Sequence, residues 1–365
     1  MHKLMVELGD RSYPIYIGAG LLDTVATYFS NHDISKKSPL MIVTDENVAT
    51  HYLDTLVQSL RVDGYTVVTA VVAVGEQSKS LANLELLVGI ALEGGLDRKS
   101  AIVALGGGVV GDLAGYVAAS YMRGVKFVQI PTTILAHDSS VGGKVAVNHP
   151  LAKNIIGAFH QPEFVLYDLN TLQSLPDRDV KSGLAEVVKH GLIWDAQFVD
   201  WCIAHADKLV AKDAESLGYA LYKGCSVKAQ VVSQDERENS LRAILNLGHT
   251  IGHALEAVAG YGELMHGEAI SIGMIGSAKL GVRYGASEEL LRITTLALES
   301  CGLPTSISSQ YDTDEILAAM MHDKKFSEGT TVFVVPTEIG TVEIKPNVPV
   351  EWVREIIEEL KQEDK

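Results

Sequence analysis

The chain has 365 residues, enough for two domains of ordinary size with substantial hydrophobic cores. Hydrophobic residues make up 47% of it and charged residues 21%, close to the averages of globular proteins, which excludes wholesale disorder. Its 30 basic and 46 acidic side chains give a formal charge of −16. This acidic balance argues against nucleic acid or an anionic membrane as a partner, because either would repel most of the surface.

The cysteines and the apolar segments indicate the compartment. Cys202, Cys225 and Cys301 are too few and too scattered for a disulfide framework or a four-cysteine zinc site. The first residues, MHKLMVELGDRSY, contain no apolar run of signal-peptide length. No segment reaches the ~18 uncharged apolar residues of a membrane helix. We therefore expect a cytoplasmic protein.

In the first half of the chain, short β-rich apolar runs alternate with helical patterns. The runs are Leu40–Thr44, Thr66–Val74, Ala101–Leu105, Lys126–Ile130 and Phe164–Tyr167. Runs of this kind, separated by segments with helical periodicity, predict βαβ units and a parallel sheet.

The pattern changes after Leu175-Pro176-Asp177, where long helical segments replace the strands. The expected helices are Lys181–Trp194, Ala196–Ala211, Asp213–Ser233, Thr250–Ala259, Gly267–Tyr284 and Glu288–Cys301. A hairpin of Thr330–Pro336 with Thr341–Lys345 and a helix from Val350 would close the chain. We therefore expect two domains, an α/β domain over residues 1–176 and a mainly helical one over residues 177–365.

A glycine-rich turn follows the third of these strands. Gly106, Gly108 and Gly111 satisfy G-x-G-x-x-G, a spacing that lets backbone N–H groups and a helix N-terminus approach a pyrophosphate. The alternative is close packing of strand on helix without a ligand. No acid follows the next strand to hold a ribose, so a nucleotide site of non-standard topology would take its acid from Asp45 or Glu76.

The segment His137–His160 combines cations with glycines. Lys144, Lys153 and Asn154 lie on what we interpret as a glycine-punctuated loop. In an acidic protein this grouping favours a phosphate or carboxylate ligand over a merely solvated loop. Arg123, Lys228, Arg237, Arg242, Asn246 and Lys324 would form a second anion-binding group only if the fold brings them together.

The helical half contains candidate metal ligands. Glu186 and His190 are spaced i, i+4, as are His249 and His253, and His266 follows 17 residues after His249. That spacing places two side chains on one helix face, and imidazole with carboxylate suits zinc. The spacing alone leaves open which three of these residues bind a metal. The interval of the metalloprotease motif H-E-x-x-H is absent, which argues against a protease.

Several segments, in this order, resemble the 3-dehydroquinate synthase family, within the sugar-phosphate cyclases. They are VGEQSKS (74–80), GGGVVGDLAGYVAASYMRG (106–124), PTTILAHDSSVGGKVAVNHPLAKNIIGAFHQP (131–162), GLAEVVKHG (183–191), DERENSLRAILNLGHTIGHALE (235–256) and HGEAISIGM (266–274). The resemblance implies a Rossmann-like nucleotide-binding domain, an all-helical metal-binding domain and an active site in the cleft between them. Small departures at Val74, Ser78, Val145, Ala152 and His190 avoid the positions that carry chemistry.

The resemblance also implies ligand sets. The metal, zinc or alternatively cobalt, would be held by Glu186, His249 and His266. NAD would be bound by Asp45, Asn47, Gly75, Glu76, Gln77, Lys79, Gly107, Gly108, Val109, Val110, Gly111, Asp112, Thr132, Thr133, Lys144, Lys153, Thr171, Leu172, Gln173 and Ser174. The substrate and the reacting groups would be contacted by Asp138, Lys144, Lys153, Asn154, Lys189, Lys228, Arg242, Asn246, His253, Lys324 and Arg123.

The implied enzyme is an NAD- and metal-dependent carbon–oxygen lyase of the shikimate pathway, which leads to chorismate and the aromatic amino acids. It would convert 3-deoxy-D-arabino-heptulosonate 7-phosphate into 3-dehydroquinate and phosphate, with NAD consumed and regenerated in each turnover. Arg242 and Lys228 would lie near the substrate carboxylate, Lys153, Asn154, Lys324 and Arg123 nearer the phosphate, and His253 would relay protons. Arg123 would reach the partner's site in a homodimer.

Three rival functions remain. A metal- and NAD-dependent polyol dehydrogenase would accumulate NADH and would have no use for the lysine and arginine cluster. A sister cyclase acting on a substrate without a carboxylate would lack some of these cations. A non-catalytic sugar-phosphate or nucleotide sensor would have lost a metal ligand or the glycine turn.

Overall fold

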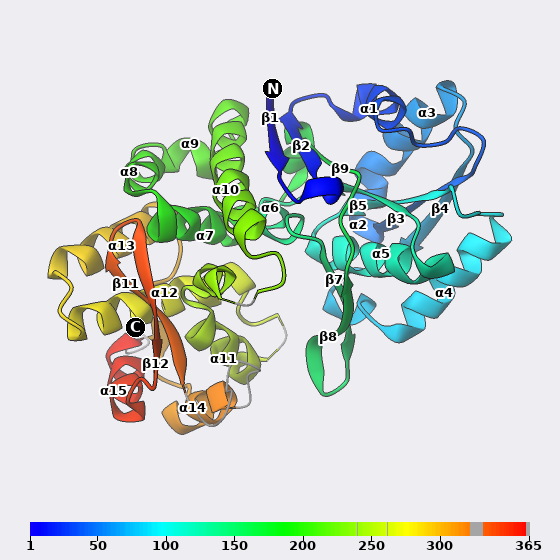
Figure 1. The fold of residues 1–365 in the computed structure, drawn as a ribbon. Coiled ribbons are helices and arrows are strands. Elements are labelled where there is room, and N and C mark those ends of the chain that lie inside the picture. The colour runs from blue at the N-terminus through cyan, green and yellow to red at the C-terminus, as the bar shows by residue number, and fades with distance from the viewer. Residues whose placement is uncertain (239, 261, 322–330, 363–365) are drawn as a thin grey trace. The chain divides into compact units, whose positions relative to one another are not determined.

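The structure, a computed structural model, describes residues 1–238, 240–260, 262–321 and 331–362, which fall into two units (Figure 1). The first unit comprises Met1–Leu175 and Leu217–Glu236, and the second comprises Pro176–Ser216 and Arg237–Lys365. The first division falls after Leu175. The division 1–176 and 177–365 inferred from the sequence places this boundary one residue later and assigns Leu217–Glu236 to the second domain.

The contacts of helix α10 (Ala214–Gln234) explain that difference. From Leu217 onward its buried side chains pack on the first unit, and Tyr222 stacks on His2 with ring centroids 5.0 Å apart. The Cys225 thiol donates to the carbonyl oxygen of His137 at 3.6 Å. Helical periodicity identifies such a helix, but not the unit on which its apolar face packs.

The first unit is built on a seven-stranded sheet of order β1-β2-β9-β6-β5-β3-β4. Its strands are β1 (His2–Val6), β2 (Tyr13–Gly18), β3 (Leu40–Asp45), β4 (Val67–Val72), β5 (Ala101–Gly106), β6 (Lys126–Pro131) and β9 (Phe164–Asp168). All neighbouring strands are parallel except β1 and β2. The predicted parallel sheet is confirmed, whereas β1 and β2 are not among the strands that the apolar runs predict.

Helices cover both faces of this sheet. They are α1 (Val25–Asn31), α2 (Glu46–Val48), α3 (Asp54–Val62), α4 (Leu81–Glu93), α5 (Gly108–Ser120) and α6 (Ala136–Ser139). Alternate residues of β3 enter two separate cores, Leu40 and Ile42 on the side of α1 and α3, Met41 and Val43 on the side of α4 and α5. Burial on both faces explains why these strands read as continuous apolar runs.

Strand order creates a topological switch point at the carboxyl edge of the sheet. Strand β4 lies on one side of β3 and β5 on the other, so the chain reverses its direction of travel across the sheet. At such a switch point the loops that follow the two central strands diverge, and ligands bind between them. Asp45 ends β3, and the glycine turn follows β5.

The segment over residues 137–160, which we expect to be a loop, instead consists largely of regular secondary structure. It contains the end of α6 and an antiparallel hairpin of β7 (Lys144–His149) and β8 (Ala152–Phe159), which extends from the first unit (Figure 1). The register shifts between Val147 and His149, so the hairpin carries an irregularity near its turn. The glycines at its base obscured the short apolar alternation of β7.

The second unit is mainly helical, as expected. It contains α7 (Asp177–Trp194), α8 (Ala196–Ala204), α9 (Ala206–Val210), α11 (His249–Ala259), α12 (His266–Arg283), α13 (Glu288–Ser300), α14 (Thr313–Met321) and α15 (Val350–Leu360). Its strand pairs are β11 (Val332–Glu338) with β12 (Thr341–Pro346), which is the predicted hairpin, and β10 (Ile307–Ser308) with β13 (Lys361–Gln362). Across the described ranges, none of the helices has the length and apolarity needed to span a bilayer.

Several short helical turns complete the chain. They are η1 (Gly9–Arg11), η2 (Leu22–Thr24), η3 (Ala49–Leu53), η4 (Glu76–Ser78), η5 (Tyr121–Arg123), η6 (Leu169–Ser174) and η7 (Leu241–Asn246). The predicted helix over Ala196–Ala211 is interrupted at His205, where φ is −117°, and so becomes α8 and α9.

Two glycines of α12 allow close helix contacts in this unit. A Cβ on Gly267 would lie 1.9 Å from the carbonyl oxygen of Ser182 in α7. A Cβ on Gly273 would lie 1.9 Å from the carbonyl oxygen of Gly248, which caps α11. Helix α12 therefore touches backbone on both sides, and neither contact tolerates a side chain.

Gly273→Ala should destabilise the protein by about 2 kcal/mol or more, since the added methyl group must push α12 away from α11. The matched control is Gly89→Ala in α4, where a Cβ would meet nothing within 4 Å. Because alanine favours helix, this control should gain up to about 1 kcal/mol. Urea unfolding followed by circular dichroism measures both, and equal stabilities would contradict the close contact.

Candidate metal and nucleotide sites

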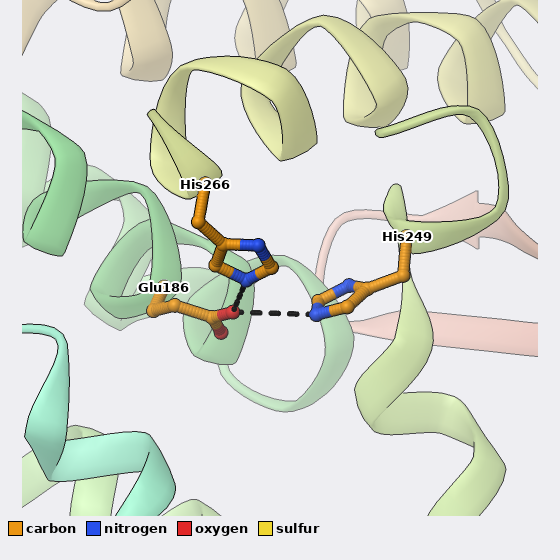
Figure 2. A group of neighbouring side chains, drawn as sticks. All are labelled: Glu186, His249 and His266. Carbon is orange, nitrogen blue, oxygen red and sulfur yellow. Dashed lines mark hydrogen bonds and ion pairs between the residues drawn. The ribbon is translucent and has the colours of Figure 1, made fainter. Parts of the chain in front are cut away.

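Three side chains from three helices of the second unit meet at one point (Figure 2). Glu186 lies in the middle of α7, whereas His249 and His266 are the first residues of α11 and α12. The close contacts of Gly267 and Gly273 bring these two helix ends toward α7. The i, i+4 spacing of the sequence places pairs on one helix face, but it does not show that three helices converge.

The three potential ligand atoms are directed at a common centre. Glu186 Oε1 lies 3.4 Å from His249 Nε2 and 3.3 Å from His266 Nε2 (Figure 2). Glu186 is 1% exposed, and its other oxygen forms an ion pair with Lys189. Two imidazoles and a carboxylate within this distance match the three-ligand sets of catalytic zinc sites, which leave a position open for substrate.

The two histidines differ in protonation. Burial lowers the pKa of His249 to about 3, with help from the Lys189 ammonium, so this ring is neutral. For His266, burial alone would lower the pKa, but hydrogen bonds to Glu186 and Glu256 outweigh it and raise the pKa to about 9. A metal must therefore displace a proton from His266 at neutral pH.

Glu256 was not among the residues found from the sequence. Its Oε2 lies 3.1 Å from His266 Nδ1, on the side of the ring opposite Glu186. A carboxylate in this place fixes the tautomer and orientation of a ligating histidine. The available signal was the spacing His253-x-x-Glu256, which puts both side chains on the same face of α11.

The other predicted residues of the second unit lie as follows. The His253 ring centroid lies 5.2 Å from that of His249 and 5.9 Å from that of His266. A ring nitrogen of His190 lies within 4.8 Å of a Glu186 carboxylate oxygen. Arg242 is buried in η7, and Asn246 Nδ2 donates to Glu238 at 3.4 Å. Lys324 lies outside the described residues.

In the first unit, the predicted nucleotide residues follow the carboxyl ends of parallel strands. Asp45 and Asn47 follow β3, residues 107–112 follow β5, Thr132 and Thr133 follow β6, and residues 171–174 follow β9. Asp45 Oδ1 also caps α2, because it accepts from the backbone N–H of Asn47 and Val48 at 2.9 Å. Thr171 and Leu172 are buried, whereas Gln173 and Ser174 are exposed.

The glycine turn is shaped as a cradle. Gly107 caps α5, whose first turn presents unbonded backbone N–H groups. A Cβ on Gly107 would lie 3.1 Å from Thr133, and one on Gly108 would lie 3.1 Å from Ser139. The buried Thr132 Oγ1 has no hydrogen-bond partner among the described residues. These features fit the pyrophosphate of a dinucleotide.

A polar network lies beside this turn. The Lys79 ammonium is 5% exposed and donates to Asp112 Oδ2 at 2.7 Å and to Asn154 Oδ1 at 2.5 Å. Burial raises the pKa of the Asp112 carboxyl, and the neighbouring Lys79 ammonium offsets part of that rise. Residues predicted to bind NAD and a residue predicted to bind substrate therefore touch within one unit.

Four further predicted cations have separate places in the first unit. The Lys228 ammonium donates to the carboxylate and the carbonyl oxygen of Asp138, both at 2.7 Å. Lys144 and Lys153 are exposed on the hairpin. Arg123 is exposed on a turn in which Met122, Arg123 and Gly124 all have positive φ, which sets its side chain apart from α5.

Comparison with known proteins identifies relatives over nearly the whole chain. Residues 69–182 match the family profile "3-dehydroquinate synthase N-terminal", and residues 183–326 match "3-dehydroquinate synthase C-terminal". A 3-dehydroquinate synthase from Desulforamulus reducens is 48% identical over 351 residues, which cover 95% of this chain and 97% of the relative.

Solved structures share the fold over a similar extent. A 2-deoxy-scyllo-inosose synthase complexed with carbaglucose-6-phosphate, NAD⁺ and Co²⁺ superposes with a TM-score of 0.90 at 28% identity, covering 98% of this chain and 100% of that one. The 2-epi-5-epi-valiolone synthase of Streptomyces hygroscopicus, with NAD⁺ and Zn²⁺ bound, gives 0.86 at 26% identity, covering 97% and 98%.

His266→Ala should abolish retention of divalent metal while the fold is kept, because a three-ligand site loses one ligand. We expect about one metal ion per chain in the parent and close to none in the variant, as measured by plasma mass spectrometry after gel filtration. His51→Ala, at an exposed position of the first unit, is the control and should keep its metal. Full metal content in His266→Ala would show that the ligand set is wrong.

Glu256→Gln should weaken metal binding about tenfold near pH 9.5, where His266 is mostly neutral in both proteins, because the ring loses its charged acceptor. The parent's affinity falls as the pH drops below about 9, since binding must then displace the His266 proton. Glu256→Gln removes one of the two carboxylates that raise the pKa of His266. The difference in metal affinity between the variant and the parent should therefore become smaller toward pH 7. Competition titration with a chromophoric chelator measures both affinities.

Glu263→Gln removes the same charge from the exposed loop before α12 and should behave like the parent at every pH. An orienting role of Glu256 would be excluded if Glu256→Gln bound metal as tightly as the parent at pH 9.5, or no more weakly than Glu263→Gln does.

Proposed function

Because this chain belongs to the 3-dehydroquinate synthase family, we propose that the residues described above convert 3-deoxy-D-arabino-heptulosonate 7-phosphate into 3-dehydroquinate and phosphate. The reaction oxidises an alcohol, eliminates phosphate, reduces the ketone again and closes the ring by an intramolecular aldol step. The convergence of Glu186, His249 and His266 is the observation that carries this proposal, since the resemblance to the family implies a metal bound by these three residues.

Both required groups fit the residues present. The imidazole and carboxylate donors suit zinc, and also cobalt, while the Gly107 cradle and the Thr132 hydroxyl suit NAD. When bound, the divalent metal lowers the pKa of the alcohol it contacts, and NAD takes up a hydride and returns it.

In the second unit, positive groups would hold the carboxylate end of the substrate. Arg242 offers a planar fork of donors that matches a carboxylate, and Asn246 adds an amide. Lys189 holds Glu186 through an ion pair, so it both orients this ligand and adds positive charge. His253, next to the two histidine ligands, is placed to move protons during the reaction.

In the first unit, the hairpin and α10 would supply the remaining contacts. Lys144 and Lys153 provide exposed ammonium groups for the phosphate. Because Lys79 occupies the amide oxygen of Asn154, its Nδ2 is the donor directed to a ligand. Asp138 holds the Lys228 ammonium in place for the substrate carboxylate.

The rival activities explain fewer of these residues. Sister cyclases that act on substrates without a carboxylate would not need both Arg242 and Lys228. Iron-containing alcohol dehydrogenases share the fold at TM-scores of 0.66 and 0.69, but at 15–17% identity this likeness extends to the fold alone. They would also leave the lysines of the hairpin unexplained.

A direct assay is phosphate release from 3-deoxy-D-arabino-heptulosonate 7-phosphate in the presence of NAD and zinc. We expect many turnovers, which a chelator abolishes and added zinc restores. Glucose 6-phosphate lacks the carboxylate and should release no phosphate. Release from glucose 6-phosphate alone would instead support a sister cyclase, and release that resists the chelator would contradict the metal assignment.

A homodimer with shared sites is part of the proposal. The strained turn at Met122–Gly124 directs Arg123 into solvent, as expected for a residue that serves a neighbouring subunit. Arg123→Ala and His266→Ala chains should each be nearly inactive. A mixed dimer would contain one complete site, in which the His266→Ala chain supplies Arg123.

Co-expression of the two variants should therefore restore about a quarter of the parent activity, because half the dimers are mixed and each has one working site. Phosphate release from the purified mixture measures this. Activity no higher than that of the separate variants would exclude sharing of Arg123 across the dimer.

The enzyme's proposed setting is the cytoplasm. All three cysteines are free and buried, and burial raises the pKa of Cys225 and Cys301 to about 12, which leaves these thiols unreactive. Free thiols of this kind are typical of reducing compartments.

A further inference from the structure

Asn148 links two segments that the proposed function assigns to different ligands. One is η4, residues 76–78, with its neighbour Lys79, in the loop predicted to bind NAD. The other is the β7–β8 hairpin, which carries Lys153 and Asn154. Asn148 lies where the hairpin register shifts, and it belongs to neither predicted ligand set.

Its amide is engaged on both sides. Asn148 Nδ2 donates to Glu76 Oε1 at 2.7 Å, and Asn148 Oδ1 accepts from the backbone N–H of Asn154 at 2.8 Å. In addition, the Asn148 backbone N–H donates to the Lys79 carbonyl oxygen at 2.9 Å. Only a side chain with both a donor and an acceptor can make the first two bonds.

Lys79 closes the network from the other direction. Its ammonium bonds to Asn154 Oδ1 at 2.5 Å and lies 3.6 Å from Glu76 Oε1. Glu76, Asn148, Asn154 and Lys79 therefore form a ring of polar contacts, in which the Lys79 side chain is 5% exposed. A movement of the cofactor loop would pull on the hairpin through two independent links.

The backbone of Asn154 depends on this support. Its φ is +54°, a region that costs free energy for a residue with a side chain, although asparagine tolerates it better than most. The bond from its N–H to Asn148 and the bond from Lys79 to its amide hold this conformation. They also fix which atom of the Asn154 amide remains for a ligand.

We propose that Asn148 is a positioning residue that couples the cofactor loop to the substrate hairpin, so that NAD binding in this unit favours the phosphate-binding conformation of Asn154. This inference rests on the proposed function for the identity of the two ligands. The coupling works by ordering, since a loop fixed by the first ligand lowers the cost of fixing the hairpin for the second.

Asn148→Asp is the sharpest variant because it keeps the shape of the side chain. It replaces the donor that faces Glu76 with a carboxylate oxygen, which Glu76 repels. Hydrogen exchange of the hairpin amides over residues 152–156, measured without ligand, should accelerate about tenfold or more. Asn31→Asp adds the same charge at an exposed position and should leave this exchange unchanged.

The functional readout is the affinity for NAD measured by calorimetry with and without inorganic phosphate. In the parent, phosphate should lower the Kd for NAD several-fold, and in N148D the two Kd values should become equal. The double variant N148D/E76Q reverses the amide–carboxylate pair, because the new glutamine amide can donate to the new carboxylate. The double variant should regain the effect of phosphate on the Kd for NAD to the level measured for E76Q alone. A substitution that merely damaged the fold would not be rescued in this way.

The inference would be overturned if phosphate had no effect on NAD affinity in the parent, if N148D kept the parent's coupling, or if N148D/E76Q failed to regain it. Failure of the proposed function would look different, because the parent would then bind no NAD in either titration.

Discussion

The chemistry of the second unit depends on how closely α12 lies against α7 and α11. Gly267 meets the backbone of α7, and Gly273 meets the cap of α11, each at a distance that excludes a methyl group. These contacts bring the first residues of α11 and α12 to the middle of α7, where Glu186 lies between the His249 and His266 imidazoles (Figure 2). The geometry of these three side chains is a consequence of helix packing, which is rigid because protein interiors are close-packed.

Charge distribution around the centre follows from that packing. Glu186 is buried among His249, His266 and Lys189, and its negative charge is compensated by the Lys189 ammonium and the protonated His266, whereas His249 is neutral. Glu256 then supplies a second carboxylate behind His266. A divalent cation would replace the His266 proton in this arrangement, and the surrounding groups would need little rearrangement.

In the first unit, the candidate nucleotide site is formed by backbone groups and by the order of the strands. Its strand order puts a switch point at β3 and β5, where ligands bind in such sheets, and the glycine turn after β5 places the N-terminus of α5 beside it. The hydrogen bonds of Lys79 connect this edge of the sheet to the β7–β8 hairpin. The glycine motif follows β5, the fourth parallel strand of the chain, because β5 and β3 border the switch point.

Sequence patterns predicted the elements well where periodicity was long. The buried strands β3, β5, β6 and β9 and the helices α7, α10, α12 and α13 were found within a few residues. Strands β1 and β2 were missed because their apolar alternation is short, and the β7–β8 hairpin because glycines at its base resemble a loop. The unit to which α10 belongs depends on tertiary contacts that no local pattern contains.

The candidate site was only partly accessible from the sequence. Spacing left Glu186, His190, His249, His253 and His266 as equal candidates for a metal, and the resemblance to a family selected three of them. Those three do lie together in the structure. Glu256 and Asn148 were missed because each acts through one contact with a residue distant in sequence, a relation that spacing does not encode.

The central claim is that NAD is reduced and reoxidised within one turnover while the protein holds it. A stopped-flow experiment that mixes the NAD- and zinc-loaded enzyme with 3-deoxy-D-arabino-heptulosonate 7-phosphate tests this most directly, with absorbance at 340 nm and phosphate release followed together. We predict a transient absorbance that never exceeds the concentration of sites and decays as phosphate accumulates far beyond it. Absorbance that rises with every turnover would contradict the account and indicate a dehydrogenase.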